Sequence, residues 1–311
     1  MTRRTLRALG LDVAPARHPL SYPGRPVTEP ALLAGEELTP LVAGPGRLGT
    51  WRVGTAALDH VLASLGCPLT GRRHPVLAVG SNASPAQLAH KLTRQGLPAT
   101  VPMVPVRVRG IGVGCSGHIG RFGYVAAAPY ADPAAERPLV ASWLDAGQLA
   151  AVDATELNYW RVLLPGDAFA MVLPSGRRLG GAYLYVSKWG VLTDPGSGLP
   201  RPGGGDQSAL LAALLLASPR LRALLGPGPG NWVERAAADA RVRAAGAQVF
   251  VDEGWVRSPE GLPAYDPAHG GDGASALCQD DLEDNPPQVS PALTHATTRT
   301  NREPSIPRLS S

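Results

Sequence analysis

The sequence feature that most constrains the fold is a short apolar run that leads through three small residues into a strong helix start. Residues 76–79 form an apolar run typical of a buried strand, and residues 80–82 read Gly-Ser-Asn. Residues 84–87, Ser-Pro-Ala-Gln, supply a Ser N-cap, a Pro at the first helical position and a Gln that can close a capping box. The pattern predicts a strand, a tight loop and a helix that runs to about Gln95, in a fold containing both kinds of element.

The Gly-Ser-Asn loop admits two interpretations. A loop that enters a helix directs unpaired backbone N–H groups to one place, where the helix dipole favours negative charge, so a carboxylate or phosphate is a suitable ligand. The alternative is that these three residues serve only as a turn, for which Gly, Ser and Asn are common choices.

Several further elements are predicted from periodicity, capping signals and turn residues. The expected helices cover residues 55–65, 145–157, 207–225 and 232–245. The expected strands cover residues 100–128, 139–144, 160–164, 169–173 and 179–186, with a last bent strand at 248–251 and 254–256. Glycines between 110 and 123 predict tight turns or bulges in the first of these strands.

Glu156 is a candidate functional carboxylate. With Asp145 as N-cap, it follows Leu149 and Val152 at helical spacing and lies on the apolar face. Burial there would raise the pKa of the carboxyl group and suit it to accept a proton near neutral pH. The alternative is that the helix ends earlier, so that Glu156 faces water or pairs with Arg161.

Three segments together resemble the gamma-glutamylcyclotransferase-like superfamily over about Pro75 to Val186. These segments are VLAVGSNASPAQL, LDAGQLAAVDATELNYWRV and GGAYLYVS, in that order. The family has a strand and a Tyr-Gly-Ser-Asn loop entering a helix, then a glutamate after a short helix, then a tyrosine and a pair of strands. The resemblance implies an α+β fold with a small mixed β-sheet or barrel and flanking helices.

The resemblance also implies an activity and a set of site residues. Gly80, Ser81 and Asn82 would hold the α-carboxylate of a gamma-glutamyl group, with Val79 at the position of the family's loop tyrosine. Glu156 would act as general base and acid while the α-amine attacks the γ-carbonyl. The products would be 5-oxoproline and a free amine, with no cofactor and no metal.

Two features of this sequence depart from the family pattern. Val79 lacks the phenol of the loop tyrosine, and Leu157 stands where a glycine more often follows the glutamate. Tyr159, which we place in the substrate site, and the strand tyrosines Tyr183 and Tyr185 lie close enough in sequence to replace the phenol, although strand tyrosines are more often packing residues.

The chain divides into four predicted segments. Residues 1–74 are rich in proline and are expected to form an extended arm with one helix. Residues 75–190 are the expected core, and residues 191–265 a helical extension packed on it. Residues 266–311 are acidic and poor in apolar residues, and are expected to be disordered.

Composition excludes several classes of function. The net charge is +4, but the arginines are scattered and Lys occurs only at Lys91 and Lys188, which argues against a nucleic-acid-binding surface. The three cysteines show no CxxC spacing, and His90 and His118 are interpreted as solvated or core histidines. Without a recognisable signal peptide or membrane span, a cytoplasmic location is expected.

Two other functions remain open from the sequence. One is a non-catalytic protein that binds a small carboxylate metabolite in the same pocket. The other is an interaction protein in which the arm and the acidic tail contact a partner.

Overall fold

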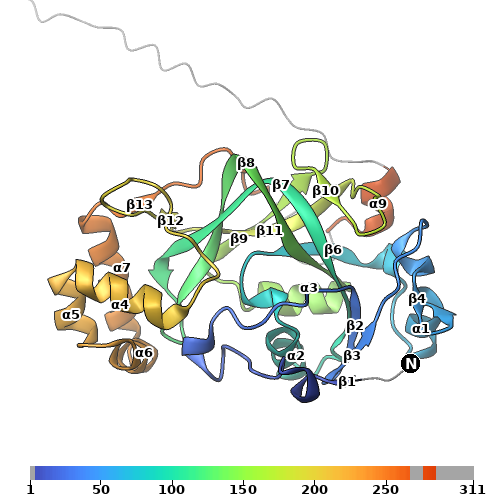
Figure 1. Cartoon of the computed structure of the whole chain (residues 1–311), viewed down its shortest axis with the longest axis horizontal. Helices are drawn as coiled ribbons and strands as arrows, with labels where there is room; N and C mark the ends of the chain where they lie inside the picture. The colour runs from blue at the N-terminus through green and yellow to red at the C-terminus, as the bar shows by residue number, and fades with distance from the viewer. Residues whose placement is uncertain (1–3, 267–275, 285–311) are drawn as a thin grey trace, which may run out of the picture.

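The computed structural model describes residues 4–266 and 276–284, and it is a mixed α/β fold built on one large sheet. Eleven strands form this sheet, and the described residues also contain eight α-helices. Figure 1 shows the sheet at the centre, with α4 to α7 gathered at one end and α1 and α9 at the other.

The strands vary from two residues to twenty residues in length. They are β1 (Arg4–Thr5), β2 (Ala31–Ala34), β3 (Glu37–Pro40), β4 (Arg52–Val53), β5 (Ala56–Ala57), β6 (His74–Ala78), β7 (Thr100–Ile119), β8 (Val125–Leu144), β9 (Tyr159–Pro165), β10 (Met171–Val172), β11 (Gly181–Ser187), β12 (Val191–Leu192) and β13 (Val256–Arg257).

The α-helices are mostly short. They are α1 (Leu58–Ser64), α2 (Pro85–Thr93), α3 (Ala146–Asp153), α4 (Gln207–Ala217), α5 (Pro219–Leu225), α6 (Pro229–Ala238), α7 (Ala240–Asp252) and α9 (Gln279–Asp284).

The main sheet is mostly antiparallel and is not a closed barrel. Its strand order is β1-β3-β2-β7-β8-β6-β11-β9, with β10, β12 and β13 as side branches. The pair of β6 with β11 is parallel, with Val76 opposite Tyr183. An α+β fold was therefore correctly predicted. The expectation of a small sheet or barrel was wrong, because the sheet also contains strands from outside residues 75–190.

The N-terminal segment is a structural part of the sheet and not only an arm with one helix. Strands β2 and β3 form a hairpin, and β2 pairs with β7, so that Leu33 lies opposite Val101. Leu33 and Trp51 are both fully buried. The many prolines of this segment separate short strands, and they do not prevent it from joining the core.

Strands β7 and β8 form a long hairpin that also pairs with β2, β6, β10 and β12. The register shifts between Arg109 and Gly110 and again between Cys115 and Ile119. Gly110 has φ of +85°, a conformation that residues with a side chain rarely adopt. The predicted bulges are thus confirmed, because glycine permits the local change of direction within a continuous strand.

Helices α2 and α3 cover one face of the sheet, as Figure 1 shows. Alternation along β6 sends Val76 to the cluster that contains these helices, while Leu77 joins the cluster on the opposite face. Gln95 at the end of α2 donates to Ala151 O of α3 at 2.7 Å, which ties the two helices together.

The C-terminal helices correct the predicted boundaries. The helix expected over 207–225 breaks at Ser218, which ends α4 and caps α5, with Pro219 as the first residue of α5. Asp239 makes the same kind of break between α6 and α7. The strand expected at 248–251 is wrong: these residues form the last turns of α7, whose Val249 and Phe250 pack against the other C-terminal helices.

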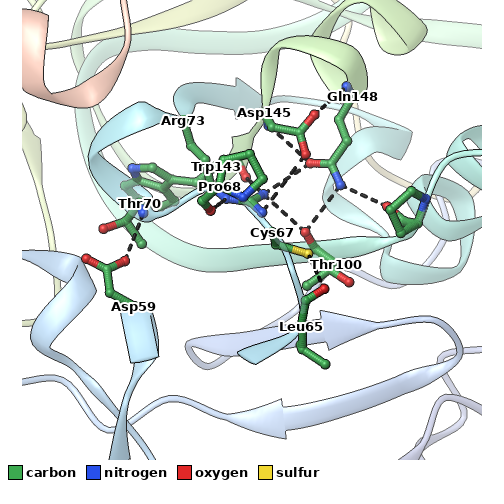
Figure 2. Close-up of polar contacts among 11 residues, drawn as sticks. Asp59, Leu65, Cys67, Pro68, Thr70, Arg73, Thr100, Trp143, Asp145 and Gln148 are labelled. Atoms are coloured by element: carbon green, nitrogen blue, oxygen red, sulfur yellow. Dashed lines mark hydrogen bonds and ion pairs between the residues drawn. The ribbon is translucent and has the colours of Figure 1, made fainter. Parts of the chain in front are cut away.

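A fully buried arginine joins several of these elements (Figure 2). Arg73 donates through Nε to Pro68 O, and through Nη1 to Thr100 O and Trp143 O at 3.1 Å each. It also donates to Gln148 Oε1 at 3.2 Å, in the first turn of α3. Burial lowers the pKa of Arg73, and the nearby Asp145 carboxylate opposes this effect. Arg73 therefore holds α3 against the starts of β6 and β7.

Part of the predicted tail is ordered. Residues 276–284 include α9, and Leu277 N donates to Tyr183 Oη at 2.7 Å while Leu282 is buried. The expectation of disorder is therefore wrong for these residues. Residues 267–275 and 285–311, to which the same expectation applied, lie outside the described residues.

Among the described helices, none alone is both long enough and apolar enough to cross a membrane. Helices α4 and α5 meet these requirements of length and composition only together, as a pair bent by 119°.

Candidate functional site

A cavity of about 440 Å³ lies where the end of β6, helix α2, the α3–β9 loop and the β7–β8 hairpin meet. All six residues predicted for the site line this cavity, namely Val79, Gly80, Ser81, Asn82, Glu156 and Tyr159. Its volume is within the usual range for a small-molecule site. The fold therefore brings together two motifs that lie more than seventy residues apart, as the Asn82 to Glu156 hydrogen bond shows.

The loop after β6 has a close neighbour that the sequence did not indicate. Gly80 lies directly against the hydroxyl of Tyr22, and any Cβ at position 80 would overlap that oxygen. Residues Ser81–Ala83 then form one turn of 3-10 helix before Ser84 caps α2. Position 80 requires glycine because the Tyr22 hydroxyl lies so close to it. The backbone conformation does not require glycine, because the φ of −134° is open to any residue.

The Ser84 cap of α2 is confirmed, but the full capping box is not. Ser84 Oγ accepts from Gln87 N at 3.5 Å, whereas Gln87 Oε1 accepts from Ala16 N at 3.0 Å. The Gln87 side chain therefore binds the N-terminal segment, which also contributes Tyr22 to the cavity. At α3 the box formed by Asp145 and Gln148 is complete.

Helix α2 and the two residues that follow it present a polar row to the cavity. Gln87, His90, Lys91, Arg94 and Gln95 all line it, at the spacing of one helix face. Lys91 Nζ donates to Asn82 Oδ1 at 2.8 Å and lies 2.6 Å from Glu156 Oε1. One ammonium group therefore connects the loop residue to the glutamate.

The carboxylate of Glu156 is held through one of its two oxygens. Oε1 accepts from Asn82 Nδ2 at 3.0 Å and from Lys91 Nζ at 2.6 Å. Among the described residues, Oε2 has no hydrogen-bond donor. The side chain is 14% exposed, so Oε2 remains available to a ligand in a site that is largely shielded from solvent.

The backbone around Glu156 differs from the prediction. Helix α3 ends at Asp153, and Glu156 lies in the following turn, not in the last turn of the helix. The pairing with Arg161 is also not formed, because Arg161 Nε binds Asp153 Oδ1 at 3.0 Å. Glu156 reaches the cavity because the turn after α3 redirects the chain, with Glu156 N donating to Asp153 O at 3.0 Å.

Tyrosines form one wall of the cavity. Tyr22 stacks on Tyr124 with ring centroids 4.3 Å apart, and its hydroxyl accepts from Ala127 N at 2.7 Å. Tyr159 donates to Ala127 O at 2.9 Å, so the two phenols bind the N–H and the C=O of the same residue of β8.

These phenols stay protonated at neutral pH. Burial raises the pKa of Tyr22, Tyr124 and Tyr159, and the negative charge of Glu156 adds to the effect in each case. Tyr185, the remaining tyrosine of the lining, donates to Asp153 Oδ1 at 2.6 Å, and burial raises its pKa as well. Tyr183 does not line the cavity and binds Leu277 instead.

His118, which was predicted from the sequence to be a solvated or core histidine, also lines the cavity. It is 5% exposed, and burial lowers its pKa to about 4, partly offset by the negative charge of Glu156. The neutral imidazole is therefore buried from bulk solvent and also forms part of the cavity lining.

Several residues of the cavity were not predicted from the sequence, and one of them, Lys91, has a feature by which it could have been found. Lys91 is one of only two lysines in the chain, and it follows Gln87 by one helical turn. Tyr22 carried no comparable signal, because its place depends on the path of the N-terminal segment over the loop. The same holds for Tyr124, which only the β7–β8 hairpin brings to the site.

The charged side chains that line the cavity are Lys91, Arg94, Arg121 and Glu156. Three cations and one carboxylate favour a ligand that carries negative charge. Within residues 4–266 and 276–284, no group of three or more His, Cys, Asp or Glu side chains is placed to hold a metal ion.

Comparisons with known proteins do not identify a family for this chain. No family model, curated protein or solved structure matches the chain.

Proposed function

We propose that this protein is a gamma-glutamylcyclotransferase-like enzyme that cyclises a gamma-glutamyl amide or amine to 5-oxoproline and releases the amine. The observation that carries the proposal is the carboxylate of Glu156. It lies beside the Gly80 to Asn82 loop in a shielded cavity, with Oε1 bound to Asn82 and Lys91 and with Oε2 available to a ligand.

The loop and its cations provide the anchor for the substrate. The α-carboxylate of a gamma-glutamyl group is assigned to the loop, where the first N–H groups of the Ser81–Ala83 turn have no partner inside that turn. The excess of basic side chains in the lining supports binding of this carboxylate.

The reaction needs proton transfer and orientation. The neutral α-amine attacks the γ-carbonyl carbon, and a new C–N bond forms. Glu156 accepts the proton that this nitrogen loses and delivers it to the departing nitrogen, whose bond to the γ-carbon breaks. Nucleophile and electrophile belong to one molecule, so holding the chain in a folded conformation lowers much of the barrier.

The test uses Glu156→Gln and a panel of gamma-glutamyl amides, peptides and amines, with release of 5-oxoproline followed by mass spectrometry. We expect the wild type to turn over at least one class of substrate, and the variant to be slower by roughly a hundredfold or more. Glu234→Gln, at an exposed position of α6, is the matched control and should behave as wild type. Wild-type rates in Glu156→Gln would overturn the assignment.

A second candidate is a binding protein for a small carboxylate metabolite. The three basic side chains of the lining favour it, because they attract such ligands whether or not a reaction follows. Calorimetric binding of 5-oxoproline together with no turnover of any gamma-glutamyl compound would select this candidate.

A further inference from the structure

His118 belongs to a buried chain of hydrogen bonds that ends at the cavity. His118 Nδ1 lies 2.6 Å from Ser116 Oγ, and Ser116 Oγ lies 2.7 Å from Ser187 Oγ. Ser187 Oγ accepts from the backbone N–H of Trp189 at 3.1 Å. Both serines are buried, so this chain links strands β7 and β11 behind the cavity wall.

One direction of this chain gives each of the two serine protons an acceptor within the chain. A peptide N–H can only donate, so Ser187 Oγ is an acceptor toward Trp189. In that direction Ser187 donates to Ser116 Oγ, and Ser116 donates to Nδ1 of His118. In this arrangement each hydroxyl proton has an acceptor, which matters because unpaired buried polar groups are costly.

The direction of the chain determines the tautomer of the histidine. If Nδ1 accepts from Ser116, the proton of the neutral ring is on Nε2. Nε2 has no hydrogen-bond partner within the described part of the chain, and the residue lines the cavity. The low pKa of His118 keeps the ring neutral near pH 7, so Nε2–H is a donor that does not bring a positive charge.

We propose that His118 donates through Nε2–H to the γ-carbonyl oxygen of the substrate and stabilises the negative charge that develops there as the amine attacks. The inference rests on the proposed function. His118 contacts the ring of Tyr159 edge to face, with centroids 5.8 Å apart, and so lies beside a residue of the predicted site. His118 and Glu156 both line the same cavity.

A neutral donor suits this role better than a second acid or base. With a pKa of about 4 the imidazole is a weak base near neutral pH, so His118 is better suited to donate a hydrogen bond than to accept a proton. A fixed donor aimed at a developing oxyanion typically contributes a factor of about 10² to 10³ to kcat, because it strengthens binding in the transition state more than in the ground state.

The experiment compares His118→Leu with His118→Gln on a substrate that the wild type turns over. The Gln amide nitrogen can replace the Nε2–H donor, and Leu cannot. We expect His118→Leu to lose about a hundredfold in kcat with KM changed by less than about threefold, and His118→Gln to recover most of the loss. Equal losses in both variants, no loss in either, or a rise in KM at constant kcat would overturn the role in catalysis.

A second measurement covers the case in which His118→Leu does not fold. Nitrogen-15 NMR of wild-type imidazoles should report the neutral Nε2–H tautomer for His118, and Ser116→Ala should shift the tautomer populations and lower kcat. A wild-type Nδ1–H tautomer would overturn the inference. A wild type that releases no 5-oxoproline overturns this inference together with the proposed function, whereas an active wild type with an unaffected His118→Leu overturns this inference alone.

Discussion

Lys91 Nζ lies 2.6 Å from Glu156 Oε1, and this contact joins helix α2 to the turn after α3 in the lining of the cavity. Both side chains are largely shielded, at 11% and 14% exposure. A pair in this environment is more than a surface ion pair, because removing one partner leaves the other charge partly buried and uncompensated.

The first prediction concerns this pair. Lys91→Met should lower the free energy of unfolding by about 1–3 kcal/mol, because Glu156 and Asn82 lose a shared donor. A double-mutant cycle with Glu156→Gln, measured by urea unfolding, should give a coupling energy of about 1 kcal/mol or more. Arg241→Met, at an exposed position of α7, is the control, and an additive cycle would show that the contact contributes nothing.

The second prediction concerns the approach of the N-terminal segment to the loop. Gly80→Ala should destabilise the protein by roughly 1–3 kcal/mol, because the new Cβ overlaps the Tyr22 hydroxyl. Combining it with Tyr22→Phe should cost less than the sum of the two single changes, since the overlapping oxygen is gone. Gly44→Ala, where a Cβ meets no other atom, is the control.

The third prediction concerns the pH dependence of stability. The pKa of His118 is about 4 in the folded protein and near 6.5 when unfolded, so the unfolded state binds this proton more readily. The contribution of neutral His118 to the free energy of unfolding is therefore complete above pH 6.5. It decreases as the pH falls toward 4, by roughly 3 kcal/mol in total.

The difference in unfolding free energy between wild type and His118→Gln isolates this effect from other groups with shifted pKa values, such as His74, whose pKa burial lowers, and Asp153, whose pKa burial raises. Chemical unfolding at several pH values should show the wild type losing stability faster than the variant below pH 6.5. Parallel curves would contradict the burial of a neutral imidazole.

The fourth prediction concerns the buried arginine of Figure 2. Arg73→Met should cost roughly 3 kcal/mol or more, because the carbonyls of Thr100 and Trp143 lose a buried donor. Arg72→Met changes an exposed neighbour and should stay within about 0.5 kcal/mol of wild type in thermal or urea unfolding. Similar losses in both variants would show that the arginine network does not hold α3 in place.

The sequence could predict features that depend on neighbouring residues. The strand at residues 76–79 and the Ser84 cap follow from local chemistry, and so does the complete capping box of Asp145. The predicted helix ends were less accurate. Ser218 and Asp239 each end one helix because their side chains cap the next one. The short apolar stretch at 248–251 fits a strand or a buried helix equally well, and packing against the other C-terminal helices selected the helix.

The sequence by itself determined that a Gly-Ser-Asn loop enters a capped helix and that a glutamate follows a second capped helix. Only the tertiary structure decided that Tyr22, Lys91 and His118 meet these motifs at one cavity. The physical reason is that their positions depend on contacts between distant segments, such as the parallel pairing of β6 with β11 and the binding of Gln87 to Ala16. Local propensity carries no information about such contacts, whereas the buried sheet and its shared core determine them together.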